Sequence, residues 1–247
     1  MTARAADAGN RTLADEPADG RPSGAAKRTL ADDAYAELKA RIMRSELVPG
    51  AKLSIDGMAK ELAFSQTPIR EALARLESEG LLARRPLSGY TVEPLLSAAE
   101  FADLFDLRMM LEPLAARRAA ERGRTGADLA DAARTPAPGA GKLAFTEADQ
   151  RFHEAVAAES GSVQIAKAIR RLDAHLHLHR AYIAPESISE TEAEHLAVAE
   201  AIIAQQPLAA EAAMRRHLEL SRVRHAAAFT AAEAAAAPKA KRARANR

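Results

Sequence analysis

The chain of 247 residues contains no cysteine, which excludes both a disulfide scaffold and a zinc site built from thiolates. Aromatic residues make up only 4% of the sequence and runs of β-branched residues are short, so a large β-sheet is not expected. No apolar run is long enough to cross a bilayer, and the N-terminus lacks the hydrophobic segment of a signal peptide. We therefore expect a mainly α-helical cytoplasmic protein that makes no contact with a membrane.

An excess of charge of one sign is also lacking. The chain has 35 Lys and Arg against 34 Asp and Glu, and residues 28–94 carry ten of each kind by count from the sequence. Overall charge therefore gives no argument for nucleic-acid binding, which must rest on a motif and on the local placement of basic residues.

Composition and helix-breaking residues divide the chain into four predicted segments. Residues 1–27 have too little apolar surface to offset the entropy of ordering and are predicted to form a disordered arm. Residues 28–94 form a first domain that ends at the linker proline Pro94. Residues 97–230 are helical in pattern, with breaks that suggest five or six helices, and residues 231–247 form a basic tail.

The first domain shows three short amphipathic helices followed by a hairpin. Thr29 and Asp32 form a capping box before the first helix, and Ser54 and Ser65 are the expected N-caps of the other two. Two short extended stretches flank the turn at residues 86–89. This order is that of a winged helix-turn-helix, with the helix-turn-helix at about residues 55–74, whose second helix enters the major groove of DNA.

Polar side chains on the third helix lie opposite its apolar face. Arg70 can pair with guanine and Gln66 with adenine, while Thr67 at the helix N-terminus suits a phosphate. On pattern alone, a solvated polar face is an equally valid interpretation. The candidate DNA-contacting residues are Ser65, Gln66, Thr67 and Arg70 on the helix and Ser88 and Gly89 at the tip of the wing.

Several stretches in this segment match a known family in order and spacing. Residues 49–53 (PGAKL), 65–73 (SQTPIREAL), 76–82 (LESEGLL) and 88–92 (SGYTV) closely resemble the DNA-binding domain of the GntR family. The resemblance implies a homodimer that binds operator half-sites on double-stranded DNA. The chain departs from the family at Ala63, where glycine is usual, and at Gln66 and Asp56, where arginine is frequent, which puts the operator sequence in doubt.

The second segment resembles the helical ligand-binding (FCD) domain of the FadR-type branch of that family. The matching stretches are residues 105–115 (FDLRMMLEPLA), 149–153 (DQRFH), 194–195 (EH) and 214–217 (MRRH). The resemblance implies a metal ion held by Asp149, His153, His195 and His217, and it implies that Arg108 meets the carboxylate of a small effector. A guanidinium binds a carboxylate bidentately, although a surface or interface ion pair is an alternative role for Arg108. Between residues 121 and 145, where the family has a longer helix, we expect a shortened segment that is partly a loop.

The proposed ligand types agree with a transition metal. Asp149 and His153 are four residues apart and share one helix face, although such a pair also arises by chance in a chain with seven histidines. One carboxylate and three imidazoles suit Zn, Ni, Mn or Fe. Three further histidines alternate at residues 175, 177 and 179, and we expect His175 and His179 to share a helix face and His177 to point away. A surface position is the default expectation for all three; lining the ligand cavity or replacing a metal ligand are the alternatives.

The function predicted from these features is a sequence-specific transcription regulator, expected to be a repressor, whose operator binding responds to a small carboxylate. A metal-dependent hydrolase that uses the Asp/His cluster is the alternative, but no general base stands beside the metal set as in H-E-x-x-H enzymes. A third possibility is a structural helical protein whose basic tail binds nucleic acid without specificity. Neither alternative accounts for the winged-helix segment.

Overall fold

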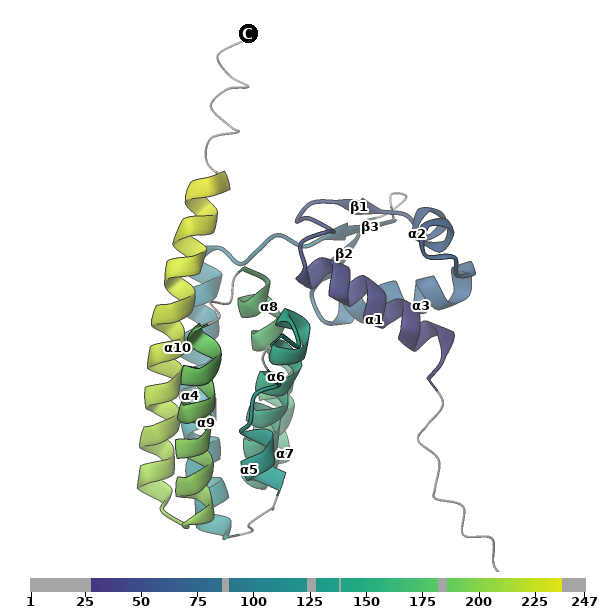
Figure 1. Ribbon diagram of the computed structural model, residues 1–247. Helices are drawn as coiled ribbons and strands as arrows, with labels where there is room; N and C mark the ends of the chain where they lie inside the picture. Colours follow the sequence, from purple (N-terminus) through teal and green to yellow (C-terminus); the bar gives the residue numbers. More distant parts are fainter. Residues whose placement is uncertain (1–27, 86–88, 124–127, 138, 182–185, 237–247) are drawn as a thin grey trace, which may run out of the picture.

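The computed structural model describes residues 28–85, 89–123, 128–137, 139–181 and 186–236. The predicted arm at residues 1–27, Ser88 at the wing tip and the last part of the basic tail lie outside the described residues. Figure 1 shows a small N-terminal part with a short sheet beside an elongated helical part. This arrangement confirms the predicted fold class, an N-terminal winged helix-turn-helix followed by an all-α bundle.

The N-terminal part contains three helices and a three-stranded antiparallel sheet with strand order β1-β3-β2. Its elements are α1 (Leu30–Met43), β1 (Lys52–Leu53), α2 (Ile55–Leu62), α3 (Gln66–Ser78), β2 (Leu82–Arg85) and β3 (Gly89–Val92). The strand β1 was not expected, because two residues are too few to give a periodic pattern. It pairs Leu53 with Tyr90 and thereby ties the start of α2 to the wing.

Local capping fixes the starts of these helices. The Thr29–Asp32 capping box forms as predicted, and the Ser54 hydroxyl accepts from the amide of Gly57. Ser65 occupies the N-cap position of α3, but its side chain makes no capping hydrogen bond. Ala63 ends α2 in the left-handed conformation at φ 57°, which explains why glycine is usual at this position.

The helical part consists of seven helices within the described residues. They are α4 (Ala98–Arg122), α5 (Asp128–Ala132), α6 (Lys142–Glu159), α7 (Val163–Arg171), α8 (Ala174–Ala181), α9 (Glu186–Ile203) and α10 (Pro207–Ala236). The expectation of five or six helices missed the break between α7 and α8, where Asp173 turns the chain at φ 43° without a glycine or proline. The Ser97–Glu100 capping box at the start of α4 forms as predicted.

The long helices α4, α9 and α10 pack along one another, and α6 lies against α4 (Figure 1). Their shared core contains Phe152, Met214 and Leu218 with many alanines, which allow close helix approach. The short α5 is followed by residues 133–137 and 139–141, which contain no helix, in agreement with the expected partly looped segment. No helix of the described residues is long and apolar enough to cross a membrane.

Candidate functional site: a histidine-rich centre and a DNA-reading helix

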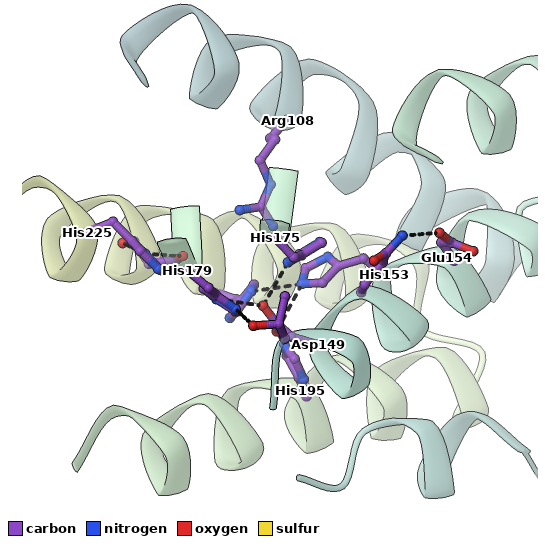
Figure 2. Close-up of polar contacts among 12 residues, drawn as sticks. Arg108, Asp149, His153, Glu154, His175, His179, His195 and His225 are labelled. Atoms are coloured by element: carbon purple, nitrogen blue, oxygen red, sulfur yellow. Dashed lines mark hydrogen bonds and ion pairs between the residues drawn. The ribbon is translucent and has the colours of Figure 1, made fainter. Parts of the chain in front are cut away.

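The four predicted metal ligands come together inside the helical part. Asp149 and His153 project from α6, His195 from α9 and His217 from α10. Each is buried, with Asp149 at 8% exposure and the three histidines at 3% or less. Residues distant in sequence thus converge because α6, α9 and α10 all pack against α4. Figure 2 shows Asp149, His153 and His195 close together.

The facing atoms are all potential electron-pair donors. Asp149 Oδ1 lies 3.2 Å from His195 Nε2 and 3.8 Å from His153 Nε2, and His153 Nε2 lies 3.2 Å from His217 Nε2. Metal–ligand bonds of about 2.1 Å place neighbouring donors about 3.0–3.4 Å apart in octahedral or tetrahedral geometry. Asp149 Oδ1 and His195 Nε2 have no hydrogen-bond partner among the described residues. The donor set therefore fits a divalent transition metal.

Two outer carboxylates face the far ring nitrogens of this set. Glu112 on α4 contacts His153 Nδ1, and Glu194 on α9 accepts a hydrogen bond from His217 Nδ1 at 2.8 Å. Metal-binding histidines commonly donate their second ring N–H to a carboxylate, which leaves the other nitrogen free for the metal. These contacts select the tautomers in which Nε2 of His153 and of His217 carries a lone pair.

Each outer carboxylate is in turn paired with an arginine. Arg108 Nε donates to Glu112 at 2.7 Å, and Arg224 donates to both oxygens of Glu194 at 2.7 and 2.8 Å. Burial alone raises the pKa of Glu194, but the hydrogen bonds from Arg224 and His217 outweigh it and hold the pKa at about 2. The outer carboxylates are thus charged and able to orient the imidazoles.

Burial also keeps the central imidazoles neutral. It lowers the pKa of His195 to about 4 and lowers the pKa of His153 well below its ordinary value. Neutral imidazole is the form that binds metal. Sequence reasoning assigned no role to the outer residues, although Glu112 follows Arg108 by four positions and Glu194 directly precedes His195, which are signals that could have been used.

Arg108 is buried, so the alternative of a surface ion pair is wrong. Its side chain is 1% exposed and points from α4 toward the histidine cluster (Figure 2). One guanidinium nitrogen pairs with Glu112, whereas Nη2 has no partner among the described residues. An unpaired buried N–H is costly, so this group is available for an anionic ligand.

The expectation that the histidines of α8 lie on the surface is also wrong. His175 is 5% and His179 is 2% exposed, and both lie near Asp149 Oδ2, with the His175 ring stacked on that of His153 at a centroid distance of 4.6 Å. They share a helix face as predicted, while the half-buried His177 points away, toward Gly80 of the N-terminal part. Their burial follows from the packing of α8 against α6, which the break before α8 makes possible.

The short helix α8 contacts both parts of the molecule. Leu176 is 1% exposed and belongs to the same core as the apolar residues of α1 and α3. Arg180 donates to the backbone carbonyl of Glu93 at 2.6 Å, just before the linker to α4. Leu178 packs instead with Phe101 and Phe105 of α4. Figure 1 shows α8 at the end of the helical part that faces the small sheet.

The predicted DNA-contacting side chains of α3 are exposed. Thr67 and Arg70 are solvent-accessible, and the amide of Gln66 donates to Asp56 at 2.7 Å. Gly89 has φ 82°, and a Cβ there would lie 2.5 Å from the Leu53 carbonyl oxygen, so the strand pairing itself requires glycine. The side chains available on this face are compatible with a DNA-reading helix.

Comparison with known proteins agrees with this architecture. Residues 30–92 match the family described as bacterial regulatory proteins, gntR family, and residues 103–220 match the FCD domain. The chain belongs to the GntR family. It is 29% identical to the HTH-type transcriptional repressor GlaR of Escherichia coli over 201 residues, which cover 75% of this chain and 91% of GlaR. An HTH-type regulator of Agrobacterium vitis is 30% identical over 51% of this chain and 77% of its own length.

Solved GntR-family structures share the fold. The E. coli protein McbR/YncC aligns with a TM-score of 0.63 at 22% identity, over 82% of this chain and 99% of that protein. A GntR regulator from Rhodococcus sp. RHA1 has the same TM-score at 21% identity, over 81% of this chain and 98% of that protein. The protein is therefore a DNA-binding transcription regulator and not an enzyme, and nothing supports the hydrolase alternative.

Proposed function

We propose that this GntR-family protein is a repressor whose affinity for its operator is set by a divalent metal and a small carboxylate bound in the helical part. The observation that carries the proposal is the convergence of Asp149 Oδ1 with three imidazole Nε2 atoms, next to the unpaired Nη2 of Arg108. The assignment as a repressor is supported by the similarity, over most of the chain, to GlaR, which is a transcriptional repressor.

The proposed metal ligands are Asp149, His153, His195 and His217, with Zn, Ni, Mn or Fe as the candidate ions. Four protein donors leave room for an effector oxygen when the ion takes five or six ligands. The metal would act as a Lewis acid that attracts the effector carboxylate. Arg108 would donate from Nη2 to a second carboxylate oxygen while its Nε stays with Glu112.

A pocket of about 750 Å³ lies between α9 and the loop before α6, near the proposed centre, although none of the four proposed ligands lines it. Phe145 lines this pocket, and its ring stacks on His179 at a centroid distance of 5.2 Å. The shortened segment after α5 forms one wall, with Pro136 and Ala137 facing the pocket. We propose this route for the effector.

The proposed coupling to DNA runs through α8. Its histidines contact Asp149 on one side, while Leu176 is part of the core of the N-terminal part. A ligand that shifts Asp149 therefore shifts a helix on which the winged helix-turn-helix rests. In this proposal α8 takes two positions, and the ligand changes the DNA affinity only as far as it binds one position more tightly than the other. A second proposed route runs through Arg108, because an effector bound to its guanidinium would shift α4, the helix that follows the linker from the N-terminal part.

We propose that the regulator acts as a homodimer with residues 28–94 as DNA-binding domain, 97–230 as effector and dimerisation domain, and tails at 1–27 and 231–247. Leu107, Met110 and Leu114 form an exposed apolar stripe on α4, with exposures of 41%, 62% and 43%. Their spacing of three and four residues places them on one helix face. Such a stripe is suited to pairing with the same helix of a second copy. In the proposed dimer, Ser65, Gln66, Thr67 and Arg70, with Ser88 and Gly89, contact each half-site.

The test combines metal analysis with DNA footprinting. Purified protein is expected to hold near-stoichiometric transition metal and to protect a symmetric site upstream of its own gene. Removal of the metal with a chelator should lower the melting temperature, because a ligand that binds only the folded state stabilises it. If the protein is metal-free and added Zn, Ni and Mn do not change its melting temperature, the metal centre is ruled out. If the protein holds metal but protects no site on this DNA, the proposed operator is ruled out.

A further inference from the structure

The carboxylate of Asp149 faces two separate sets of histidines. Its Oδ1 atom lies 3.2 Å from His195 Nε2 within the centre described above. Its Oδ2 atom lies 2.7 Å from His175 Nδ1 and 3.3 Å from His179 Nε2, both on α8. All three residues of this second set are at most 8% exposed, and their ligand atoms lie within 4.8 Å of one another.

The tautomer of His179 is fixed by a hydrogen-bond chain. The Thr146 hydroxyl has one hydrogen, which it donates to the Lys142 carbonyl at 2.8 Å. Because of this, it must accept from His179 Nδ1, which lies 3.0 Å away. In the neutral ring the Nε2 atom then carries a lone pair, and it faces the Oδ2 atom of Asp149. Two acceptors in contact inside the protein are costly, and either a metal ion between them or a proton on Nε2 removes this cost.

We propose that Asp149, His175 and His179 form a second divalent-metal site, with Asp149 bridging it to the first. Two imidazoles and one carboxylate are a ligand set that suits Zn, Mn, Fe or Ni and leaves positions open for other oxygen ligands. When the ion binds, the neutral His175 ring carries its proton on Nε2 and offers Nδ1 to the metal. The inference rests on the metal centre proposed above, because Asp149 belongs to both sites.

Charge balance predicts that the second ion enters together with an anion. The carboxylates of the buried Glu112 and the partly buried Glu194 are each paired with an arginine, whereas Asp149 has only imidazole partners. A first divalent ion therefore already exceeds the single charge of Asp149, and a second one leaves an uncompensated positive charge in a low-dielectric interior. A bridging carboxylate would relieve this excess, which links occupancy of the second site to the effector class.

The test is the number of ions per chain in the intact protein. Chelator-treated protein is saturated with Zn²⁺ in acetate buffer, freed of excess ion by gel filtration and analysed for metal. We expect two Zn²⁺ per chain in the natural sequence and one in His179→Ala and His175→Ala. His177→Ala is the matched control on the same helix, because His177 points toward Gly80, and it should keep two.

A second measurement does not depend on the folding of variants. In the natural protein loaded with Mn²⁺, two ions bridged by one carboxylate lie about 3.5–4 Å apart, so their electron paramagnetic resonance signal should be that of a coupled pair. One ion per chain in the natural sequence, with an uncoupled Mn²⁺ signal, would overturn the second site and leave the first intact. No bound ion at all would overturn both proposals.

Discussion

Leu176 of α8 is a fully buried side chain through which the helical part packs into the core of the winged helix-turn-helix. It is 1% exposed and shares a core with Leu38, Ile69 and Leu73. Leu176→Ala removes three buried carbons and leaves a cavity at this junction. Leucine-to-alanine changes at such sites cost about 2–5 kcal/mol, a range that includes both lost transfer energy and the cavity.

Leu178→Ala is the matched control for this change. Leu178 lies two residues away on the same helix and is fully buried, but it packs with Phe101 and Phe105 inside the helical part. Both variants should therefore lose a similar free energy of unfolding. Only Leu176→Ala loosens the contact between α8 and the N-terminal part, so only that variant should lose communication between the metal and the DNA.

The assay is the operator dissociation constant measured with saturating Zn²⁺ and again with chelator. Coupling free energies of about 1–3 kcal/mol correspond to a ratio of roughly 5- to 150-fold between the two conditions. We expect this ratio to fall toward one in Leu176→Ala and to persist in Leu178→Ala, at a temperature where both are folded. If Leu176→Ala kept the ratio of the natural sequence, α8 would not be the route of coupling.

Further predictions concern the metal, the DNA surface and the stability of the N-terminal part. Glu194→Gln should weaken metal binding about 10- to 100-fold, as measured by competition with a chelator, because Glu194 orients His217. Glu190→Gln is the control: it removes only the contact to Arg224 at 3.9 Å and should leave the metal affinity unchanged. Arg70→Ala should cost about 1–3 kcal/mol in operator binding by gel-shift titration, and unchanged affinity in a folded variant would remove Arg70 from the reading surface. Ala63→Gly should raise the free energy of unfolding by about 1 kcal/mol in denaturant titration, because glycine takes the left-handed conformation at this exposed helix end without the strain that alanine has. The hydrogen bonds from Thr29 and Arg75 lower the pKa of Asp32 to about 2, below its value in the unfolded chain. The stability that Asp32 provides is therefore present above about pH 4 and is lost as the pH falls toward 2. The difference in unfolding free energy between the natural sequence and Asp32→Asn should shrink over that window, and a constant difference would contradict the assignment.

The features that sequence reasoning predicted are those with a short-range signal. The Thr29–Asp32 and Ser97–Glu100 capping boxes span three residues each, and both form in the structure. The order of helices and hairpin in residues 28–94 follows from apolar spacing within single elements. The strand β1 was missed because its two residues gain their partner only when the chain returns with Tyr90 and Thr91.

The candidate metal ligands could be named from the sequence only through the resemblance to a family. Apart from the pair Asp149 and His153 on α6, the ligands come from two further helices, α9 and α10, and no local pattern specifies how these three helices pack. For the same reason the histidines of α8 were misplaced. An alternation of His175 and His179 with leucines is compatible with a surface helix, and the turn at Asp173 that brings it against α6 carries no glycine or proline.

The buried charges of the helical part explain why it is suited to sensing rather than to stability alone. Arg108 and Glu112 are almost fully buried, yet Arg108 Nη2 has no partner among the described residues. A buried ion pair contributes little net stability even when complete, and an unpaired donor adds a cost. An apolar core of the same size would therefore be more stable. Under the proposed function, the arrangement would become more favourable when an anion pairs with Nη2 and a metal ion is held by Asp149 and the imidazoles around it. The binding free energy of those two ligands would then be available to shift α8 between two positions. Because Leu176 of α8 lies in the core of the N-terminal part, the same shift would move the DNA-binding part.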